Sequence, residues 1–262
     1  MAMRAERPTA FRRKRPEEIA VMARAGRILA GCLEHVASLV APGVTTGQLD
    51  AAAESFIRDH GCTPSFLGYH GYPASICISV NEESVHGIPG ARVIEPGDLV
   101  SLDCGVILDG WQADSGMTVG CGPLDAESQR LVAVTREALR RGIAAAQPGG
   151  RIGDIGAAVS EHVHAAGFSL LRDHGGHGIG RQMHEPPEVG NAGVRGQGTA
   201  INPGLVLAIE PIVNAGTGNY RVRDDGWTVE TADGRRSAYF EHTVAITEDG
   251  PQVLTLRSDE RA

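Results

Sequence analysis

The sequence predicts a single α+β domain, and three observations support this prediction. The chain has 262 residues, of which 42% are hydrophobic, and a chain of this size buries about 70–75% of its unfolded surface without disulfides. The predicted elements run in the order helix, helix, strands, and that order occurs twice. No low-complexity linker separates the two occurrences. We therefore expect one domain whose halves are similar in structure, although they share no obvious sequence repeat.

The first half begins with two predicted helices. Pro16 and the acids after it open a helix in which apolar residues recur at the helical period, and the Pro-Gly pair at 42–43 ends it. Thr45 or Thr46 caps the second helix, which runs to Gly61. Apolar, β-branched runs then predict strands over residues 74–80, 98–108 and 111–122.

The second half repeats this order. Residues 125–150 and 151–167 form another predicted helix pair, and strands are predicted over residues 205–213, 227–231 and 237–247. The domain is expected to span residues 16–256. It would lie between a basic, flexible N-terminal arm at residues 1–15 and a C-terminal tail at residues 257–262.

Composition excludes several classes of protein. A formal charge of −8 and a pI near 5.7 argue against a specific DNA-binding protein, which usually carries a basic face. The five cysteines form no CxxC pair and their number is odd, so neither a disulfide framework nor a thiolate zinc site is indicated. No stretch approaches the roughly 20 apolar residues of a membrane helix. We expect a soluble cytoplasmic protein without a membrane partner.

The pair Asp109-Gly110 predicts a two-residue hairpin turn between two of the strands. In that register Gly105 faces Asp114, so Asp103 is the diagonal neighbour of Asp114 on the same face of the sheet. Two carboxylates at such a short separation repel each other, and one of them takes up a proton unless a cation lies between them. Exposure to solvent is the alternative for either acid, but the flanking apolar residues indicate a buried sheet. Asp109 is interpreted as a turn residue only.

Three histidines, His174, His177 and His184, lie in a glycine-rich run. The glycines argue against a helix, and the run lacks the HExxH spacing of zinc proteases. Its glycine pattern also fails as a dinucleotide or phosphate loop. A metal or substrate site remains, and the alternative for any single histidine is a hydrogen-bonded loop residue.

Glu210 and Glu241 each interrupt an apolar, strand-like run, where burial without a partner is costly. Together the four acids carry a charge of about −4, which two divalent cations would balance. With a nearby imidazole they form an oxygen-rich donor set that suits manganese, iron or cobalt better than structural zinc. The spacing therefore supports a dinuclear metal-dependent hydrolase.

Six segments of the chain resemble type I methionine aminopeptidases of the short bacterial form, in order and at family spacings, from Pro16 to Thr255. They are TPSFLGYHGYPASICISVNEESVHGIPG, DLVSLDCGVILDGWQADSGMTVG, GHGIGRQMHEPPEV, LAIEPIV, DGWTVET and FEHT. The resemblance implies the pseudo-symmetric pita-bread fold, with a central curved antiparallel sheet flanked by helices. It also implies two divalent metal ions, Co, Mn or Fe(II), held by Asp103, Asp114, His177, Glu210 and Glu241.

The activity implied by the resemblance is co-translational removal of the initiator methionine from nascent proteins whose second residue is small. A hydroxide bridging the two metals would attack the first peptide bond. In the family's arrangement, Glu210 shuttles a proton and His184 stabilises charge on the oxygen of the tetrahedral centre. His86 contacts the scissile amide.

The resemblance also implies a methionine pocket, where soft and aromatic surfaces suit a thioether. For each residue of this pocket the alternative interpretation is ordinary packing in the hydrophobic core. The same alternative applies to Phe66, and there it is favoured. A monovalent cation, Na or K, is implied near Asn81, Glu83 and Ser237. The pocket would comprise Tyr69, His70, Tyr72, Cys77, His86, Met183, His184 and Trp227.

The implied partners are the N-termini of nascent polypeptides, bound by a monomer. The basic run at residues 12–15 could contact ribosomal RNA near the exit tunnel, but a solvated charge run is the favoured interpretation.

Two alternative functions use the same fold. An X-Pro aminopeptidase or dipeptidase shares the metal ligands but normally carries an added N-terminal domain, for which 262 residues leave no room. A catalytically inactive binding protein is expected to lose ligands, whereas this chain has all five together with His86 and His184. Both comparisons favour the aminopeptidase.

Overall fold

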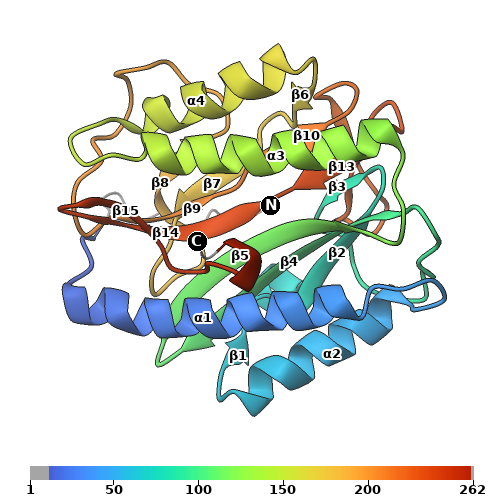
Figure 1. The fold of residues 1–262 in the computed structure, drawn as a ribbon. Coiled ribbons are helices and arrows are strands. Elements are labelled where there is room, and N and C mark those ends of the chain that lie inside the picture. Colours follow the sequence, from blue (N-terminus) through green and yellow to red (C-terminus); the bar gives the residue numbers. More distant parts are fainter. Residues whose placement is uncertain (1–11, 261–262) are drawn as a thin grey trace.

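The computed structural model describes residues 12–260 and contains four α-helices within them. Figure 1 shows the helices in two pairs, with the strands between the pairs. The predicted helices are confirmed, and each is slightly shorter than its predicted span. Their bounds are α1 (Pro16–Ser38), α2 (Thr46–Asp59), α3 (Ala126–Ala145) and α4 (Ile152–Ala165).

Helix starts follow local side-chain chemistry. Thr45, rather than Thr46, is the N-cap of α2: its Oγ1 accepts the backbone N–H of Gln48 at 3.2 Å, and Gln48 Oε1 accepts the backbone N–H of Thr45 at 2.8 Å. Asp125 caps α3 by accepting the backbone N–H of Ser128 at 2.8 Å. These bonds satisfy N–H groups that the first helical turn leaves without a partner.

The main sheet is antiparallel throughout and has nine strands within the described residues, in the order β1-β4-β5-β14-β9-β7-β8, with β2 paired to β4 and β15 paired to β14. The curved antiparallel sheet flanked by helices is therefore confirmed. The strands are β1 (Thr63–Pro64), β2 (Ile76–Val80), β4 (Leu99–Leu108), β5 (Trp111–Gly120), β7 (Gly175–Gly178), β8 (Glu185–Gly190), β9 (Val206–Ile209), β14 (Glu241–Thr247) and β15 (Gly250–Val253).

Two small sheets complete the fold, each with three strands in the described residues. One has the order β13-β10-β6 and the other the order β11-β12-β3. Their strands are β3 (Glu83–Val85), β6 (Ser169–Leu170), β10 (Ile212–Asn214), β11 (Tyr220–Val222), β12 (Val229–Thr231) and β13 (Ser237–Tyr239).

Two strands predicted as continuous are each divided. The run 205–213 breaks at Glu210 and Pro211, and the run 237–247 breaks at Phe240. Pro211 has no N–H to donate to a strand ladder. After each break the chain passes between the main sheet and the sheet formed by β13, β10 and β6. The two breaks meet, because the backbone N–H of Phe240 donates to Pro211 O at 3.3 Å.

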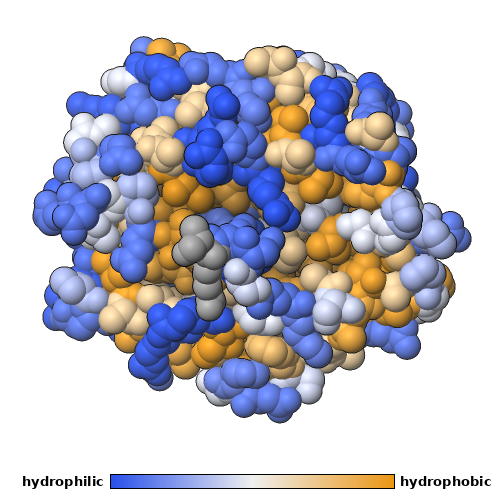
Figure 2. All heavy atoms as spheres, viewed as in Figure 1, coloured by the Kyte–Doolittle hydropathy of each residue, from blue (hydrophilic) through white to orange (hydrophobic). Residues whose placement is uncertain are grey.

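The main apolar core lies between the helices and the sheet, and it includes Leu33 of α1, Leu102 of β4, Leu139 of α3 and Leu207 of β9. Helix α1 packs on β4 and β5, while α3 contacts β9, β14 and α4. Figure 2 shows hydrophilic side chains over much of this face and apolar side chains grouped between them. No helix within residues 12–260 has the length and apolar character needed to cross a membrane.

Lys14 and Arg257 lie outside the predicted domain limits of residues 16–256, but both are packed into the domain. Lys14 is 4% exposed and pairs with Glu185, and Arg257 is 1% exposed and pairs with Glu260. The arm was expected to be solvated and the C-terminal residues to form a tail, whereas these two cationic side chains are buried. Their burial is possible because each has a carboxylate partner. Arg12, Arg13 and Arg15 of the predicted arm are exposed, and residues 1–11 lie outside the described residues.

Candidate metal centre

The β4–β5 hairpin has the predicted register. Asp109 (φ 52°) and Gly110 (φ 76°) form its turn, as two-residue hairpin turns with two positive φ angles require. Gly105 pairs with Asp114, so Asp103 is the diagonal neighbour of Asp114. The Asp109 side chain is 61% exposed and its Oδ2 lies 3.3 Å from an Arg24 nitrogen. The interpretation of Asp109 as a turn residue is confirmed.

A row of paired residues across three strands aligns two of the acids. Asp103 on β4 pairs with Gly116 on β5, and Gly116 pairs with Glu241, the first residue of β14. Paired residues in an antiparallel sheet share a face. A Cβ added to Gly116 would lie 2.0 Å from Cε1 of Tyr239, so the Tyr239 ring occupies the space that the glycine leaves open. Its hydroxyl donates a hydrogen bond to Glu241 Oε2.

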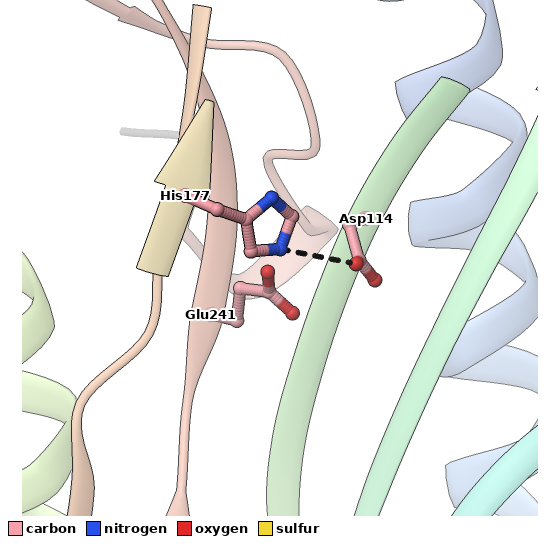
Figure 3. Close-up of side chains that lie close together, drawn as sticks. All are labelled: Asp114, His177 and Glu241. Atoms are coloured by element: carbon pink, nitrogen blue, oxygen red, sulfur yellow. Dashed lines mark ion pairs between the residues drawn. The ribbon is translucent and has the colours of Figure 1, made fainter. Parts of the chain in front are cut away.

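His177 completes the group from β7, where it pairs with Ala208 of β9. Its Nε2 lies 3.9 Å from Asp114 Oδ2 and 3.8 Å from Glu210 Oε1. One donor atom each from Asp114, His177 and Glu241 lie within 4.8 Å of one another. Figure 3 shows these three side chains converging from three different strands. The structure thus brings together acids that are more than 100 residues apart in the sequence.

Electrostatics at this site are unfavourable for bare carboxylates. Burial raises the pKa of Asp103 to about 7. Burial, followed by repulsion from Glu241 and Asp103, raises the pKa of Asp114 well above its usual range. Burial, followed by repulsion from neighbouring carboxylates, also raises the pKa values of Glu210 and Glu241 well above their usual range. Without a cation, burial and mutual repulsion favour the protonated forms of these acids.

His177 can bind a metal ion as a neutral imidazole. Burial lowers the pKa of its ring to about 3. Its Nδ1 lies 2.9 Å from Gly178 O, and because a carbonyl oxygen can only accept, Nδ1 carries the hydrogen. The lone pair of the imidazole is then on Nε2, which points toward Asp114 and Glu210.

Three buried carboxylate oxygens have no hydrogen-bond partner within residues 12–260: Asp103 Oδ1, Asp114 Oδ1 and Glu241 Oε1. Such oxygens are rare because burial without a partner is costly. Four carboxylates and one neutral imidazole are donors that divalent cations accept. The residues present therefore fit a divalent metal centre.

Two residues that the sequence did not single out support the acids. Thr243 Oγ1 accepts the backbone N–H of Asp114 at 2.9 Å and donates to the Asp114 carbonyl oxygen at 2.7 Å. Tyr239 is the donor to Glu241 described above. Each lies two residues from Glu241, so alternation along the run 237–247 was the available signal, but the run breaks between Tyr239 and Glu241.

Two further predicted histidines contact other histidine rings, His184 that of the candidate ligand His177 and His86 that of His174. The His184 ring centroid is 4.2 Å from that of His177, and His184 Nδ1 is 2.7 Å from Tyr69 Oη. The His86 ring is 6.2 Å from that of His174. Burial, then the nearby His174 and His184, lower the pKa of His86 to about 4, which keeps the His86 ring neutral at physiological pH.

Most of the predicted pocket residues form one apolar cluster. Tyr72, Cys77 and Met183 are buried, at 3%, 5% and 1% exposure, and Phe66, Tyr69 and Trp227 belong to the same cluster. Tyr72 and Trp227 pack edge to face with centroids 5.1 Å apart. His70 differs from the others: it is exposed and contacts Tyr69.

Known proteins are similar to this chain over most of its length. Residues 20–248 match metallopeptidase family M24. A methionine aminopeptidase from Clostridium perfringens is 49% identical over 243 residues, which cover 93% of this chain and 98% of that protein. Methionine aminopeptidase 1 from Mycobacterium tuberculosis is 50% identical over 246 residues, covering 91% of this chain and 92% of that protein.

A solved structure gives the same result for the fold. The crystal structure of methionine aminopeptidase from Thermotoga maritima aligns with a TM-score of 0.93 at 41% identity, covering 94% of this chain and 99% of that chain. Full-length matches to proteins of this name do not favour the X-Pro alternative.

Proposed function

Because the chain belongs to the methionine aminopeptidases of metallopeptidase family M24, we propose that it removes the initiator methionine from nascent polypeptides whose second residue is small. The observation that carries this proposal is the group of four buried or partly buried acids and one neutral imidazole, in which three buried carboxylate oxygens have no hydrogen-bond partner within residues 12–260. In this role the enzyme acts in the cytoplasm, as a monomer, near the ribosome.

Asp103, Asp114, His177, Glu210 and Glu241 would hold two divalent cations, with Co, Mn and Fe(II) as the candidates. Such ions lower the pKa of bound water and polarise a carbonyl oxygen. We further propose a monovalent cation, Na or K, near Asn81, Glu83 and Ser237. There the Asn81 carbonyl already accepts the backbone N–H of Ser237 at 2.8 Å, so the cation would use remaining lone pairs.

Three side chains around the centre have separate roles in this proposal. Glu210, whose Oε1 lies 3.8 Å from His177, takes and returns the proton of the attacking water. His184 donates a hydrogen bond to the oxygen that becomes negative as the carbonyl is attacked. Neutral His86 donates to the scissile amide or to the leaving nitrogen.

The apolar cluster around Tyr72 and Met183 would bind the methionine side chain. Its sulfur-containing and aromatic surfaces suit a thioether, and its burial excludes charged side chains. Tyr69, His70, Cys77 and Trp227 would complete this pocket. The second residue of the substrate lies beside the metal centre during attack, so a bulky side chain at that position would crowd the site.

Four peptides test the proposal: Met-Ala-Ser, norleucine-Ala-Ser, Lys-Ala-Ser and Met-Leu-Ser. The first two should be cut, because norleucine has the shape of methionine. Lys-Ala-Ser should be cut more than about 100-fold more slowly, since burial of an unpaired charge costs several kcal/mol. Met-Leu-Ser should also be slow, because its second side chain is large. Equal kcat/KM on all four would contradict this assignment of the pocket.

A further inference from the structure

A buried ion pair joins the segment before α1 to the residue that follows His184. Lys14 Nζ lies 2.7 Å from Glu185 Oε2, and the two side chains are 1% and 14% exposed. Desolvation makes a buried pair a weak source of stability, whereas removing one partner is costly. A contribution to the free energy of unfolding therefore does not by itself account for this ion pair.

Glu185 shapes the loop at residues 179–184 that connects β7 to β8. Its second oxygen, Oε1, accepts the backbone N–H of Gln182 at 3.2 Å. A Cβ added to Gly180 would lie 2.6 Å from both Glu185 Oε1 and Lys14 Cε. The backbone of the loop thus rests directly on the ion pair, and only glycine permits this approach.

Lys14 is itself attached to the main sheet. Its backbone N–H donates to Gly204 O at 2.7 Å, and the backbone N–H of Gly204 donates to Ile246 O at 2.9 Å. Ile246 belongs to β14, the strand that begins with Glu241. The ion pair therefore connects the loop to the strand that supplies one of the acids.

The loop ends with two residues assigned to substrate. Met183 is 1% exposed and belongs to the apolar cluster of the methionine pocket. His184 follows it, with its ring against His177 and its Nδ1 2.7 Å from Tyr69 Oη. Because Glu185 is the next residue, the position of its side chain constrains the backbone of His184.

We propose that Lys14 and Glu185 are positioning residues, which hold the loop at residues 179–184 so that His184 points at the reacting carbonyl. This inference rests on the proposed function of His184. It assigns a task in the active site to a lysine from the basic run ahead of the first helix.

The test is a double-mutant cycle of Lys14→Met with His184→Ala, measured as kcat and KM on Met-Ala-Ser. Misplacing a catalytic group by about 1 Å costs up to about 100-fold, so Lys14→Met should lower kcat by about tenfold with little change in KM. In the His184→Ala background it should lower kcat by less than about twofold, because a residue that acts through His184 has no further effect once His184 is absent. Lys14→Arg should restore most of kcat.

Arg24→Met is the matched control. It removes an ion pair with Asp109 that is exposed on both sides, and such pairs contribute little. If Lys14→Met does not fold, Glu185→Gln takes its place in the cycle. Equal losses of kcat in both backgrounds would overturn the inference.

A second measurement separates this inference from the proposed function. The ring resonances of His184, observed by NMR in metal-free protein labelled at histidine, should shift in Lys14→Met and Glu185→Gln but not in Arg24→Met. Unchanged resonances in both variants would overturn the inference. Failure of the wild-type protein to cut Met-Ala-Ser would instead overturn the proposed function, and the NMR comparison would still decide whether the pair positions His184.

Discussion

The two halves of the molecule deliver their acids to the metal centre in different ways. In the first half, Asp103 and Asp114 lie within the continuous strands of one hairpin, and its register alone places them side by side. In the second half, Glu210 and Glu241 lie where strands break and the chain changes sheets. The hairpin is a local structure, whereas the two breaks are joined by a contact between residues distant in the sequence, from the Phe240 N–H to Pro211 O.

Side chains and backbone from other elements satisfy the polar groups that the breaks expose. Asn191 Nδ2 donates to Glu210 O at 2.8 Å, and the backbone N–H of Phe240 donates to Pro211 O. Buried backbone groups need such partners. The hairpin acids Asp103 and Asp114 are thus placed by a local structure, whereas His177, Glu210 and Glu241 depend on contacts between strands that are distant in the sequence.

Metal removal should have the largest effect, because in the proposed function both regions hold the same cations. A chelator should abolish cleavage of Met-Ala-Ser, and Mn, Co or Fe(II) should restore it. Activity assays after dialysis, with metal analysis of the same samples, check this expectation. Full activity in metal-free protein would remove the premise that the two regions serve a common centre.

Single substitutions compare the two regions directly. Asp114→Asn in the hairpin and Glu241→Gln at a break should each lower kcat/KM on the order of 100-fold or more. Even substitution of residues that only hydrogen-bond to metal ligands typically lowers activity or metal affinity by about 10–100-fold. Asp109→Asn, in the turn of the same hairpin, should change kcat/KM by less than about twofold, because its side chain is exposed. A loss at Asp109 as large as at Asp114 would undo the distinction between turn residue and ligand.

Gly116→Ala should disturb the point where the two regions meet. The added Cβ would lie 2.0 Å from the Tyr239 ring, so the ring must move away from Glu241, and such overpacking typically costs about 1–3 kcal/mol. Denaturant unfolding and metal titration measure the losses of stability and affinity. Gly90→Ala is the control, since its Cβ would meet nothing within 4 Å. Equal stability of the two variants would show that the row from Asp103 to Glu241 tolerates a side chain.

The remaining prediction concerns pH. The pKa of Asp103 is about 7 in the folded metal-free protein and about 3.9 when unfolded. Between these values the folded state binds more protons than the unfolded state, so the free energy of unfolding of metal-free protein should fall as pH rises from about 4 to about 7, by up to about 1.4 kcal/mol per pH unit. Urea unfolding at several pH values measures this slope, and Asp103→Asn should reduce it, while Asp114, Glu210 and Glu241, whose pKa values are also raised, retain the rest. A slope of the opposite sign would contradict the burial of an uncompensated acid.

Sequence alone determined the helices, the β4–β5 hairpin and the diagonal placement of Asp103 and Asp114, because caps, helical periodicity and a two-residue turn act over short distances. It also singled out His177, Glu210 and Glu241 as polar residues in apolar or glycine-rich runs. Their meeting was decided by the tertiary structure, since pairing between strands far apart in the chain leaves no local pattern.

The same reason explains what the sequence did not reveal. The break at Phe240, the support of Glu241 by Tyr239 and the burial of Lys14 against Glu185 all depend on residues from separate elements. The break at Pro211, by contrast, had a local signal, because proline cannot donate to a strand ladder. A lysine in a basic run has the local pattern of a solvated residue. Only the packed fold supplies the carboxylate that makes its burial favourable.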